Sequence, residues 1–425
     1  MAATATRDKA ARPVVAVTGM GVVTSLGVGK SDNWAKLTAG TSGIRRISRF
    51  AIDQLRTTIA GAVDDGFREP MSPAEFSETL AMVAGEEAIA QSGIGAKGQF
   101  PGPLFIALPP VELEWRYRIS LAETAAGAGY PDLLRVARNP DLAHISQSAR
   151  YGIVADHLAD HFGTQGSPIS LTTACASGAT AIQLGVEAIR RGECQAAFAM
   201  GADGSLTTES LVRFSLLSAL STQNDPPQQA SKPFSKNRDG FVLAEGAAAL
   251  VLEDYAHARA RGARILGIIE GCGEKSDSFH RTRSSPDGKP IIACMRNALA
   301  DAGMGPEDVD YINAHGTATP ENDKMEHIGV SAVFGERIRG IPISSNKSMI
   351  GHTLTAAGAV EAVFTLLTLE HQRIPPTINY TVADPAIPLD VVPNNARDAR
   401  VERAISNSFG FGGQNVCLVM AREPA

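Results

Sequence analysis

The chain has 425 residues, which exceeds the usual size of one domain and favours two domains or one fold with an internal duplication. Its composition, 44% apolar and 20% charged with 41 glycines, excludes disordered, collagen-like and coiled-coil proteins. The 39 Lys and Arg residues against 45 Asp and Glu give a net charge of −6, so we expect no nucleic-acid partner.

The cysteines and the apolar runs indicate a cytoplasmic protein. Five widely spaced cysteines include no CxxC pair, which favours a reducing compartment and gives no sign of a metal site. The apolar run at residues 14–23 is short and contains glycines, so it predicts a strand and turn rather than a signal peptide. No run approaches the ~20 apolar residues of a membrane span.

Strand-like and helix-like segments alternate along the chain. The first group has predicted strands at 14–18, 169–172 and 196–200 and helices at 75–91 and 179–190; the second has strands at 265–269 and 309–313 and helices at 291–302 and 356–370. This alternation predicts an α/β fold with sheets covered by helices.

Short strings repeat at a constant offset. The tripeptide at 168–170 recurs at 342–344 and that at 186–188 recurs at 360–362, both 174 residues later, as a duplication would leave them. A charged helix ending at Gly262 marks the expected junction. We therefore divide the chain into an N-terminal half, residues 1–262, and a C-terminal half, residues 263–425.

Cys175 follows the predicted strand at 169–172 and precedes a helical pattern. A helix N-terminus favours thiolate, so we expect this position to lower the pKa of the thiol, and the small neighbours leave room for an acyl group. A buried core thiol fits the same local pattern. The local context alone leaves both interpretations open.

His315 and His352 each lie at the end of a predicted strand. Either one alone is also compatible with a structural hydrogen-bonding role, but His352 falls 174 residues after Gly178, three residues beyond Cys175. The duplication therefore predicts that the three side chains meet. A thiol with two imidazoles suits thioester formation followed by enolate stabilisation, which fits decarboxylation of a malonyl thioester and carbon–carbon bond formation.

An ordered set of motifs resembles the β-ketoacyl-acyl-carrier-protein synthases, closest to the synthase II type, in the thiolase-like superfamily. The matching strings are VTGMGVVT at 17–24, TACASG at 173–178, KPF at 232–234, RDGFV at 238–242, NAHGT at 313–317, KSM at 347–349 with GH at 351–352, and NSFGFGG at 407–413. The resemblance covers nearly the whole chain. It implies a thiolase-like five-layer αβαβα fold of two duplicated halves and a homodimer.

The resemblance also implies roles in fatty-acid elongation. Cys175 would take the acyl chain from an acyl carrier protein, while His315 and His352 would bind the malonyl thioester and hold the enolate. The backbone amides of Cys175 and Phe411 would form the oxyanion hole, and Phe411 would gate the site. No cofactor or metal is implied.

Supporting roles follow from the same resemblance for residues around these three. Lys347 would support the histidines electrostatically, with Glu361 facing the same site, and Thr317 and Thr319 would bind the pantetheine arm beside Phe409. Asp323 and Glu326 match family positions near the site, where we expect structural ion pairs.

Several positions depart from the family pattern. Thr355 replaces a usual Gly, Gln414 replaces a common Thr and Ala244 replaces a Gly. Residues 103–149 lack the expected Gly-rich strand, which leaves the preferred acyl chain length open.

Other readings remain to be weighed. A thiolase would place a second cysteine in its C-terminal active-site loop, whereas Cys417 lies on the predicted strand at 416–420. A cysteine hydrolase leaves the second histidine unexplained, and a non-catalytic chain-length-factor-like partner would lack Cys175. A condensing enzyme of very-long-chain lipid or polyketide synthesis fits the same residues.

Overall fold

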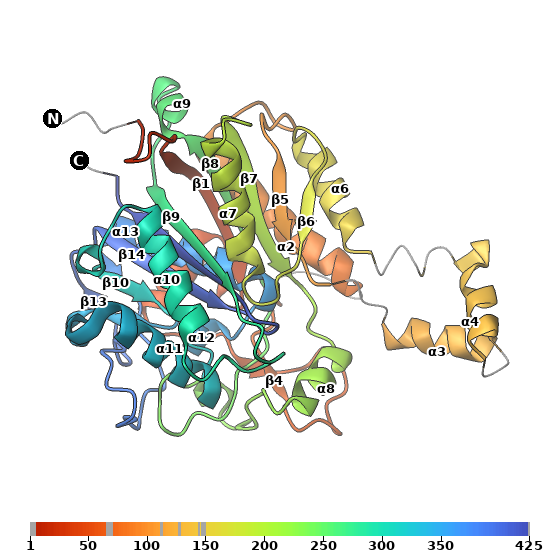
Figure 1. Ribbon diagram of the computed structural model, residues 1–425. Coiled ribbons are helices and arrows are strands. Elements are labelled where there is room, and N and C mark those ends of the chain that lie inside the picture. Colours follow the sequence, from red (N-terminus) through yellow and green to blue (C-terminus); the bar gives the residue numbers. More distant parts are fainter. Residues whose placement is uncertain are drawn as a thin grey trace.

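The computed structural model describes residues 6–64, 71–110, 114–125, 129–142, 145 and 150–423. A large mixed sheet runs through the molecule (Figure 1). Helices cover its outer faces, and other helices lie between its N-terminal strands and its C-terminal strands. Within the described ranges, no helix combines the length and the apolar character needed to cross a membrane.

The sheet has 11 strands in the order β11-β10-β14-β15-β9-β1-β8-β7-β5-β6, with β2 beside β1. From the N-terminal part come β1 (Val15–Thr24), β2 (Gly27–Val28), β5 (Leu104–Ala107), β6 (Ile169–Leu171), β7 (Ala196–Asp203) and β8 (Gly246–Asp254). From the C-terminal part come β9 (Gly267–Ser276), β10 (Tyr311–Asn313), β11 (Ile343–Ser344), β14 (Arg403–Phe409) and β15 (Gln414–Ala421).

The strand order confirms the expected duplication. With β2 left aside, each half read from its edge inward contributes its third, second, fourth, fifth and first strand, and β1 meets β9 antiparallel at the centre. The directions match as well, because β5 is parallel to β6 and β7 just as β10 is parallel to β11 and β14. The two halves therefore repeat one folding unit.

Helices complete five layers. Helices α2 (Pro73–Ser92) and α6 (Gly152–Phe162) cover the N-terminal strands, and α10 (Lys289–Asp301) and α11 (Pro320–Phe334) cover the C-terminal strands. Between the two sets lie α7 (Ser177–Arg190) and α13 (Ala357–His371), which pack against each other. Every residue of α13 from Ala357 to Leu369 is buried, as expected of a central-layer helix.

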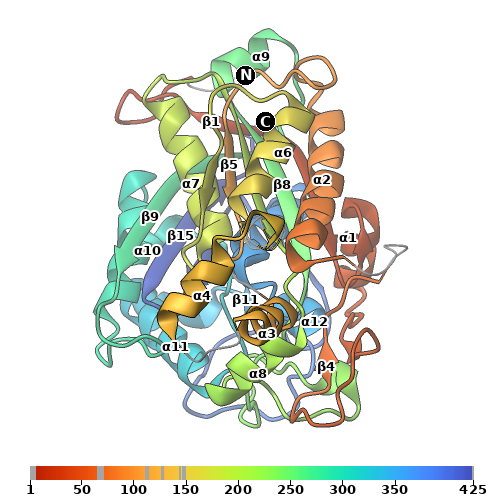
Figure 2. The same ribbon diagram turned by 90° about the vertical axis from the view of Figure 1, so that its right-hand side faces the viewer.

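Helices α1 (Lys30–Thr38), α8 (Thr208–Leu216) and α9 (Tyr255–Ala260) lie around this core, with the short strand pairs β3 (Arg45–Arg46) with β4 (Ile59–Ala60) and β12 (Arg373–Ile374) with β13 (Arg397–Asp398). The short helix α12 (Lys347–Ile350) is buried. Helices α3 (Trp115–Thr124) and α4 (Tyr130–Ala137) project from the body as an arm (Figures 1 and 2). The predicted strands and helices are thus present, although β1 and β9 extend six and seven residues beyond their predicted ends.

The two central helices approach most closely at their N-terminal ends. A Cβ on Gly178 would lie 2.5 Å from the backbone nitrogen of Ala359, and a Cβ on Gly358 would lie 2.5 Å from that of Ala179. Only glycine fits at either position. This contact brings the segments that precede α7 and α13, which carry Cys175 and His352, into one place.

We predict that Gly358→Ala lowers the free energy of unfolding by about 1–3 kcal/mol, because the added methyl group forces the helices apart. Chemical denaturation measures this change. Gly152→Ala in α6 is the matched control, since its Cβ would meet nothing within 4 Å, and it should stabilise the protein by up to about 1 kcal/mol. Equal effects of the two substitutions would contradict the proposed close packing.

Candidate active site

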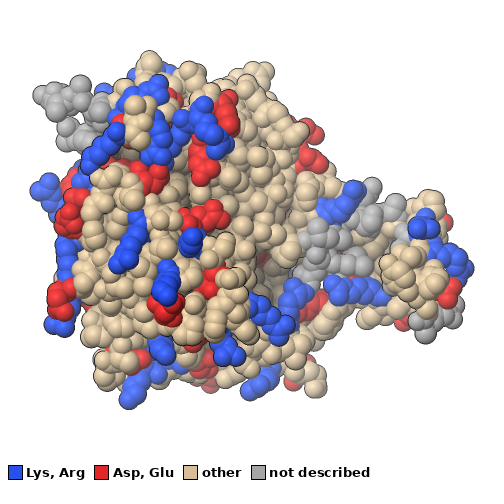
Figure 3. Space-filling model, viewed as in Figure 1, with Lys and Arg blue, Asp and Glu red and all other residues tan. Residues whose placement is uncertain are grey.

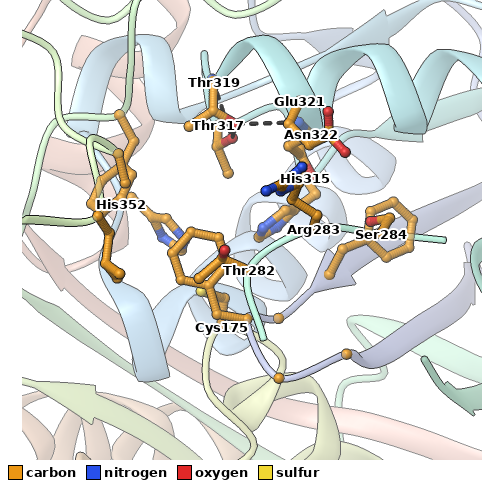
Figure 4. Close-up of a pocket in the computed structure, with 18 of the residues that line it drawn as sticks. Cys175, Thr282, Arg283, Ser284, His315, Thr317, Thr319, Glu321, Asn322 and His352 are labelled. Atoms are coloured by element: carbon orange, nitrogen blue, oxygen red, sulfur yellow. Dashed lines mark hydrogen bonds between the residues drawn. The ribbon is translucent and has the colours of Figure 1, made fainter. Parts of the chain in front are cut away.

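Cys175, His315 and His352 converge on one cavity (Figure 4). Cys175 lies between β6 and α7, His315 follows β10, and His352 lies between α12 and α13. The sulfur and one nitrogen of each imidazole all lie within 4.8 Å of one another. The structure therefore brings together the three residues that the duplication predicted would meet.

The turn that carries Cys175 is tightly constrained. Ala174 has a φ of 50°, an unfavourable conformation for a residue with a Cβ. The Ser177 hydroxyl stabilises it by donating to the Ala174 carbonyl at 2.6 Å and accepting from the Thr173 amide at 2.7 Å. The small residues of the motif thus fix the direction of the cysteine side chain.

The cavity has a volume of about 450 Å³ and is lined by both apolar and polar side chains. The apolar lining includes Phe214, Phe241, Leu354, Phe409 and Phe411. The polar lining includes Asp277, His280, Thr282, Arg283, Thr317, Thr319, Glu321 and Lys324. Such a cavity suits an acyl chain attached to a polar arm.

His352 is held as a neutral hydrogen-bond donor. The backbone N–H of Leu354 donates to its Nδ1 at 3.2 Å, so the ring proton lies on Nε2. Nε2 is buried and has no hydrogen-bond partner among the described residues. Burial and the nearby Lys347 hold the pKa of His352 well below its usual value. A substrate oxygen in the cavity would satisfy this donor.

His315 is oriented in a similar way. Lys347 Nζ lies 3.4 Å from His315 Nδ1 and donates to the His315 carbonyl at 2.7 Å, which leaves Nε2 to carry the ring proton. Burial, Lys347 and His352 lower the pKa of His315 well below its usual value. Both imidazoles are therefore neutral donors.

Lys347 and Glu361 form a buried ion pair behind His315. Both side chains are 1–2% exposed, and Lys347 Nζ donates to Glu361 Oε1. A surface position for Lys347 and an exposed helix position for Glu361 are thus both excluded. Burial raises the pKa of Glu361 to about 7, which Lys347 opposes.

Asp323 and Glu326 differ in the kind of group that their carboxylates contact. Asp323 lies 3.5 Å from Arg238 Nε, as expected of an ion pair. Glu326 instead accepts the backbone N–H groups of His315 at 2.9 Å and Gly316 at 2.7 Å. It also accepts from Asn407 Nδ2 at 3.1 Å, a contact between distant residues that no sequence motif predicts. Glu326 therefore anchors the histidine loop.

The expected low pKa of the Cys175 thiol is wrong for this conformation. The side chain is 8% exposed, and burial raises the pKa of the thiol to about 11. The Phe411 backbone amide and Lys347 oppose this shift but do not reverse it. Desolvation of the charge exceeds the stabilisation that the start of α7 provides, so the resting residue is a neutral thiol.

The remaining sequence-predicted residues line the same cavity. Thr317 and Thr319 lie 2.9 Å apart between their hydroxyl oxygens, and Thr319 caps α11 by accepting from the Asn322 amide at 3.2 Å (Figure 4). Phe409 packs edge-on against His315, with ring centres 5.8 Å apart. Phe411 precedes two glycines that both have a φ of 89°.

One Cys and two His residues are also the donor types of a zinc site. A histidine that ligates through Nε2 must carry its proton on Nδ1 and donate it to an acceptor. Here Nδ1 of each ring faces a donor, the Leu354 amide or the Lys347 ammonium. The hydrogen bonds thus favour a substrate carbonyl over a cation between the rings.

Comparison with known proteins agrees with this geometry. Residues 12–258 match the family model "Beta-ketoacyl synthase, N-terminal domain", and residues 266–381 match "Beta-ketoacyl synthase, C-terminal domain". The chain belongs to the beta-ketoacyl synthase family. Its thiolase-like α/β fold is therefore the fold of this family.

Individual relatives come from both fatty-acid and polyketide synthesis. The 3-oxoacyl-[acyl-carrier-protein] synthase 2 of Coxiella burnetii is 36% identical, covering 96% of this chain and 98% of its own length. The tetracenomycin polyketide synthase ketoacyl synthase alpha subunit of Streptomyces glaucescens is 34% identical, covering 96% and 97%. A solved type II polyketide ketosynthase in complex with its acyl-carrier protein has a TM-score of 0.84 at 32% identity, covering 96% and 99%.

We predict that the alkylation rate of Cys175 by iodoacetamide rises about tenfold for each pH unit between pH 7 and pH 10. A thiol with a pKa of about 11 is almost fully protonated there, and its thiolate fraction grows in that proportion. Peptide mapping by mass spectrometry measures the rate, with the more exposed Cys194 as an internal comparator. A plateau below pH 8 would show that the thiol has a low pKa after all.

Proposed function

We propose that the protein catalyses decarboxylative Claisen condensation of an acyl thioester with malonyl-acyl carrier protein, giving β-ketoacyl-acyl carrier protein and CO2. The observation that carries this proposal is the convergence of two neutral Nε2–H donors on the space beside a thiol. Two donors directed at one oxygen stabilise an enolate, and the thiol supplies the acyl acceptor.

Acyl transfer to Cys175 comes first. The sulfur attacks the carbonyl carbon of the acyl thioester, the thiol proton leaves to solvent, and the pantetheine thiolate departs and takes up a proton. The backbone amide of Phe411 faces the Cys175 sulfur, and the backbone amide of Cys175 belongs to the same turn, so these two N–H groups are the proposed donors to the oxyanion. The Cys175 acyl thioester is the product of this step.

Decarboxylation and condensation follow at the histidines. The malonyl thioester oxygen accepts from Nε2 of His315 and of His352, so the electron pair of the breaking bond to CO2 forms an enolate that both rings stabilise. The enolate carbon then attacks the acyl-Cys175 carbonyl, and the cysteine sulfur leaves and regains a proton. Lys347 and Glu361 keep His315 oriented.

The carrier protein is the proposed partner because the polar side chains of the cavity suit its phosphopantetheine arm. Thr317 and Thr319 present hydroxyl groups to the cavity, and Arg283 and Lys324 also line it. The solved ketosynthase complex is with an acyl-carrier protein, which supports the same partnership here. Phe409 would pack beside the reacting thioester.

Fatty-acid elongation is the pathway that we favour, and polyketide synthesis is the second candidate. The tetracenomycin relative supports the second, at an identity close to that of the synthase 2 relative. Cys175 disfavours a non-catalytic chain-length-factor-like role. We place the protein in the cytoplasm and the boundary between its halves at residues 262 and 263, after α9 and before β9.

We also propose a homodimer formed through the free edge of the sheet at β6. Its neighbour on one side is β5, and Ile169 is 45% exposed. Charged side chains are sparse over this part of the surface (Figure 3). Trp115 and Ile119 on the projecting arm are 41% and 56% exposed. Exposed strand edges and apolar stripes of this kind are normally covered, and a second copy would cover them.

The same dimer gives residues 103–149 a role. Among the described residues of this segment, none lines the cavity of its own chain. The arm therefore leaves the acyl pocket of a single chain unchanged, and its influence on chain length would act across the dimer interface.

Replacing Cys175 with Ala tests the function directly. Condensation should be abolished, while malonyl decarboxylation remains, because the enolate site does not require the thiol. Assays of β-ketoacyl product and of CO2 release by the purified variant measure the two reactions, with Cys194→Ala as the matched control that should retain both. Condensation by Cys175→Ala would refute the nucleophile assignment.

The Phe411→Ala substitution tests the prediction that Phe411 gates the active site. The Phe411 loop is tied to residues 277–285 by the Asp277 amide donating to Gly413 O and the Gly412 amide donating to Arg281 O, each at 2.8 Å. If this loop opens to admit the acyl chain, removing the Phe411 ring should allow malonyl-carrier protein to be decarboxylated before Cys175 is acylated. The amount of CO2 released should then exceed the amount of β-ketoacyl product.

The ratio of CO2 to product is the measurement, with a thermal melt alongside it. Phe279→Ala is the control, because Phe279 is 55% exposed on the neighbouring loop and should leave the ratio at one. A ratio of one for Phe411→Ala with only a lower melting temperature would make Phe411 a packing residue.

A further inference from the structure

Asp203, at the end of β7, is buried without a cationic partner among the described residues. In the part of the chain that the structure describes, Ser205 and Thr355 are the residues that donate hydrogen bonds to its carboxylate. Ser205 donates to Oδ1 from its amide at 3.1 Å and from its hydroxyl at 2.5 Å. Thr355 donates to Oδ2 from its amide at 3.2 Å, and its hydroxyl lies 2.7 Å from Oδ2 and 2.9 Å from the Ala202 carbonyl oxygen. A buried carboxylate is costly unless fully hydrogen-bonded, so these contacts fix the Thr355 turn firmly to β7.

The turn held in this way contains Leu354. Leu354 has a φ of 46°, a left-handed conformation that costs about 1–2 kcal/mol in a residue with a Cβ. In this conformation its backbone N–H reaches His352 Nδ1. The strained turn therefore provides the contact that determines which nitrogen of His352 carries the proton.

The backbone of His352 is fixed independently of this turn. Its amide donates to Val242 O at 2.7 Å, and its carbonyl accepts from the Ala244 amide at 3.0 Å. Loss of the Thr355 contacts would therefore leave the His352 backbone in place. Only the orientation and the tautomer of the His352 ring would change.

We propose that Asp203 and Thr355 are positioning residues for His352, which keep its Nε2–H directed into the cavity by holding the Leu354 turn. This inference rests on the proposed function, in which that proton binds the malonyl thioester oxygen. Neither residue touches the substrate. Their contribution belongs to decarboxylation rather than to acyl transfer onto Cys175.

The test uses Thr355→Val, which keeps the shape and removes the hydroxyl, and Thr355→Ser, which restores it. Thr368→Val is the matched control, because Thr368 is equally buried on α13 and its hydroxyl donates to Phe364 O within the helix. Asp203→Asn is the second variant, which replaces one acceptor oxygen with a donor and serves if Thr355→Val does not fold.

The first readout is kinetic. Thr355→Val should lower kcat for malonyl decarboxylation roughly tenfold, less than the 10²–10³ lost when an oxyanion donor is removed outright, with KM changed by less than about twofold. Acyl transfer to Cys175 should change little, Thr355→Ser should restore kcat, and Thr368→Val should match the wild type. Equal losses in both half-reactions, or a lower melting temperature with unchanged kcat, would overturn the proposal.

The second readout does not depend on activity. Nitrogen-15 spectra of histidine-labelled full-length protein, assigned with His352→Gln, should show the Nε2–H tautomer in the wild type and a mixed population in Thr355→Val. An unchanged His352 signal would also overturn the proposal. If the wild type fails to decarboxylate malonyl-carrier protein, the proposed function is wrong, while these spectra still decide whether Thr355 positions the ring.

Discussion

The site depends on one constraint, the contact between the N-terminal ends of α7 and α13. Gly178 and Gly358 allow the backbone of each helix to approach the other to a distance that no Cβ would permit. Cys175 precedes one helix and His352 precedes the other, so the sulfur and the imidazole come together without any further adjustment. His315 joins them because β10 ends beside β11 and β14 at the same region of the sheet.

The charges around this contact are arranged so that the reacting groups themselves stay neutral. Burial raises the pKa of the Cys175 thiol and lowers the pKa values of both histidines. The buried charges of Lys347 and Glu361 compensate each other, and Lys347 also helps to hold the pKa values of both histidines low. Neutral donors that are already oriented stabilise negative charge when it develops on the substrate during the reaction. This is the basis of electrostatic preorganisation.

Much of this was predictable from the sequence, for identifiable reasons. Hydrophobic alternation gave the strands and helices, and the offset of 174 residues placed Gly178 opposite His352. The thiol pKa was not predictable, because the effect of a helix N-terminus can be recognised from sequence whereas the degree of burial depends on packing from both halves. The Asn407–Glu326 and Asp203–Thr355 contacts were missed for a related reason, since each joins residues far apart in the chain that carry no local signal.

The division of chemistry between the halves follows from the geometry of the reaction. The enolate carbon must approach the acyl carbonyl carbon to about 3 Å, so the acyl acceptor and the enolate donors must lie within a few ångströms of each other while facing different substrates. A duplicated strand–turn–helix unit provides two such positions related by approximate symmetry. A thiol at one position and an imidazole at the other meet that requirement, whereas two thiols or two imidazoles would supply only half of the chemistry. In the proposed mechanism, the symmetry of the fold thus sets the distance between the groups, and the difference between Cys175 and His352 supplies the reaction.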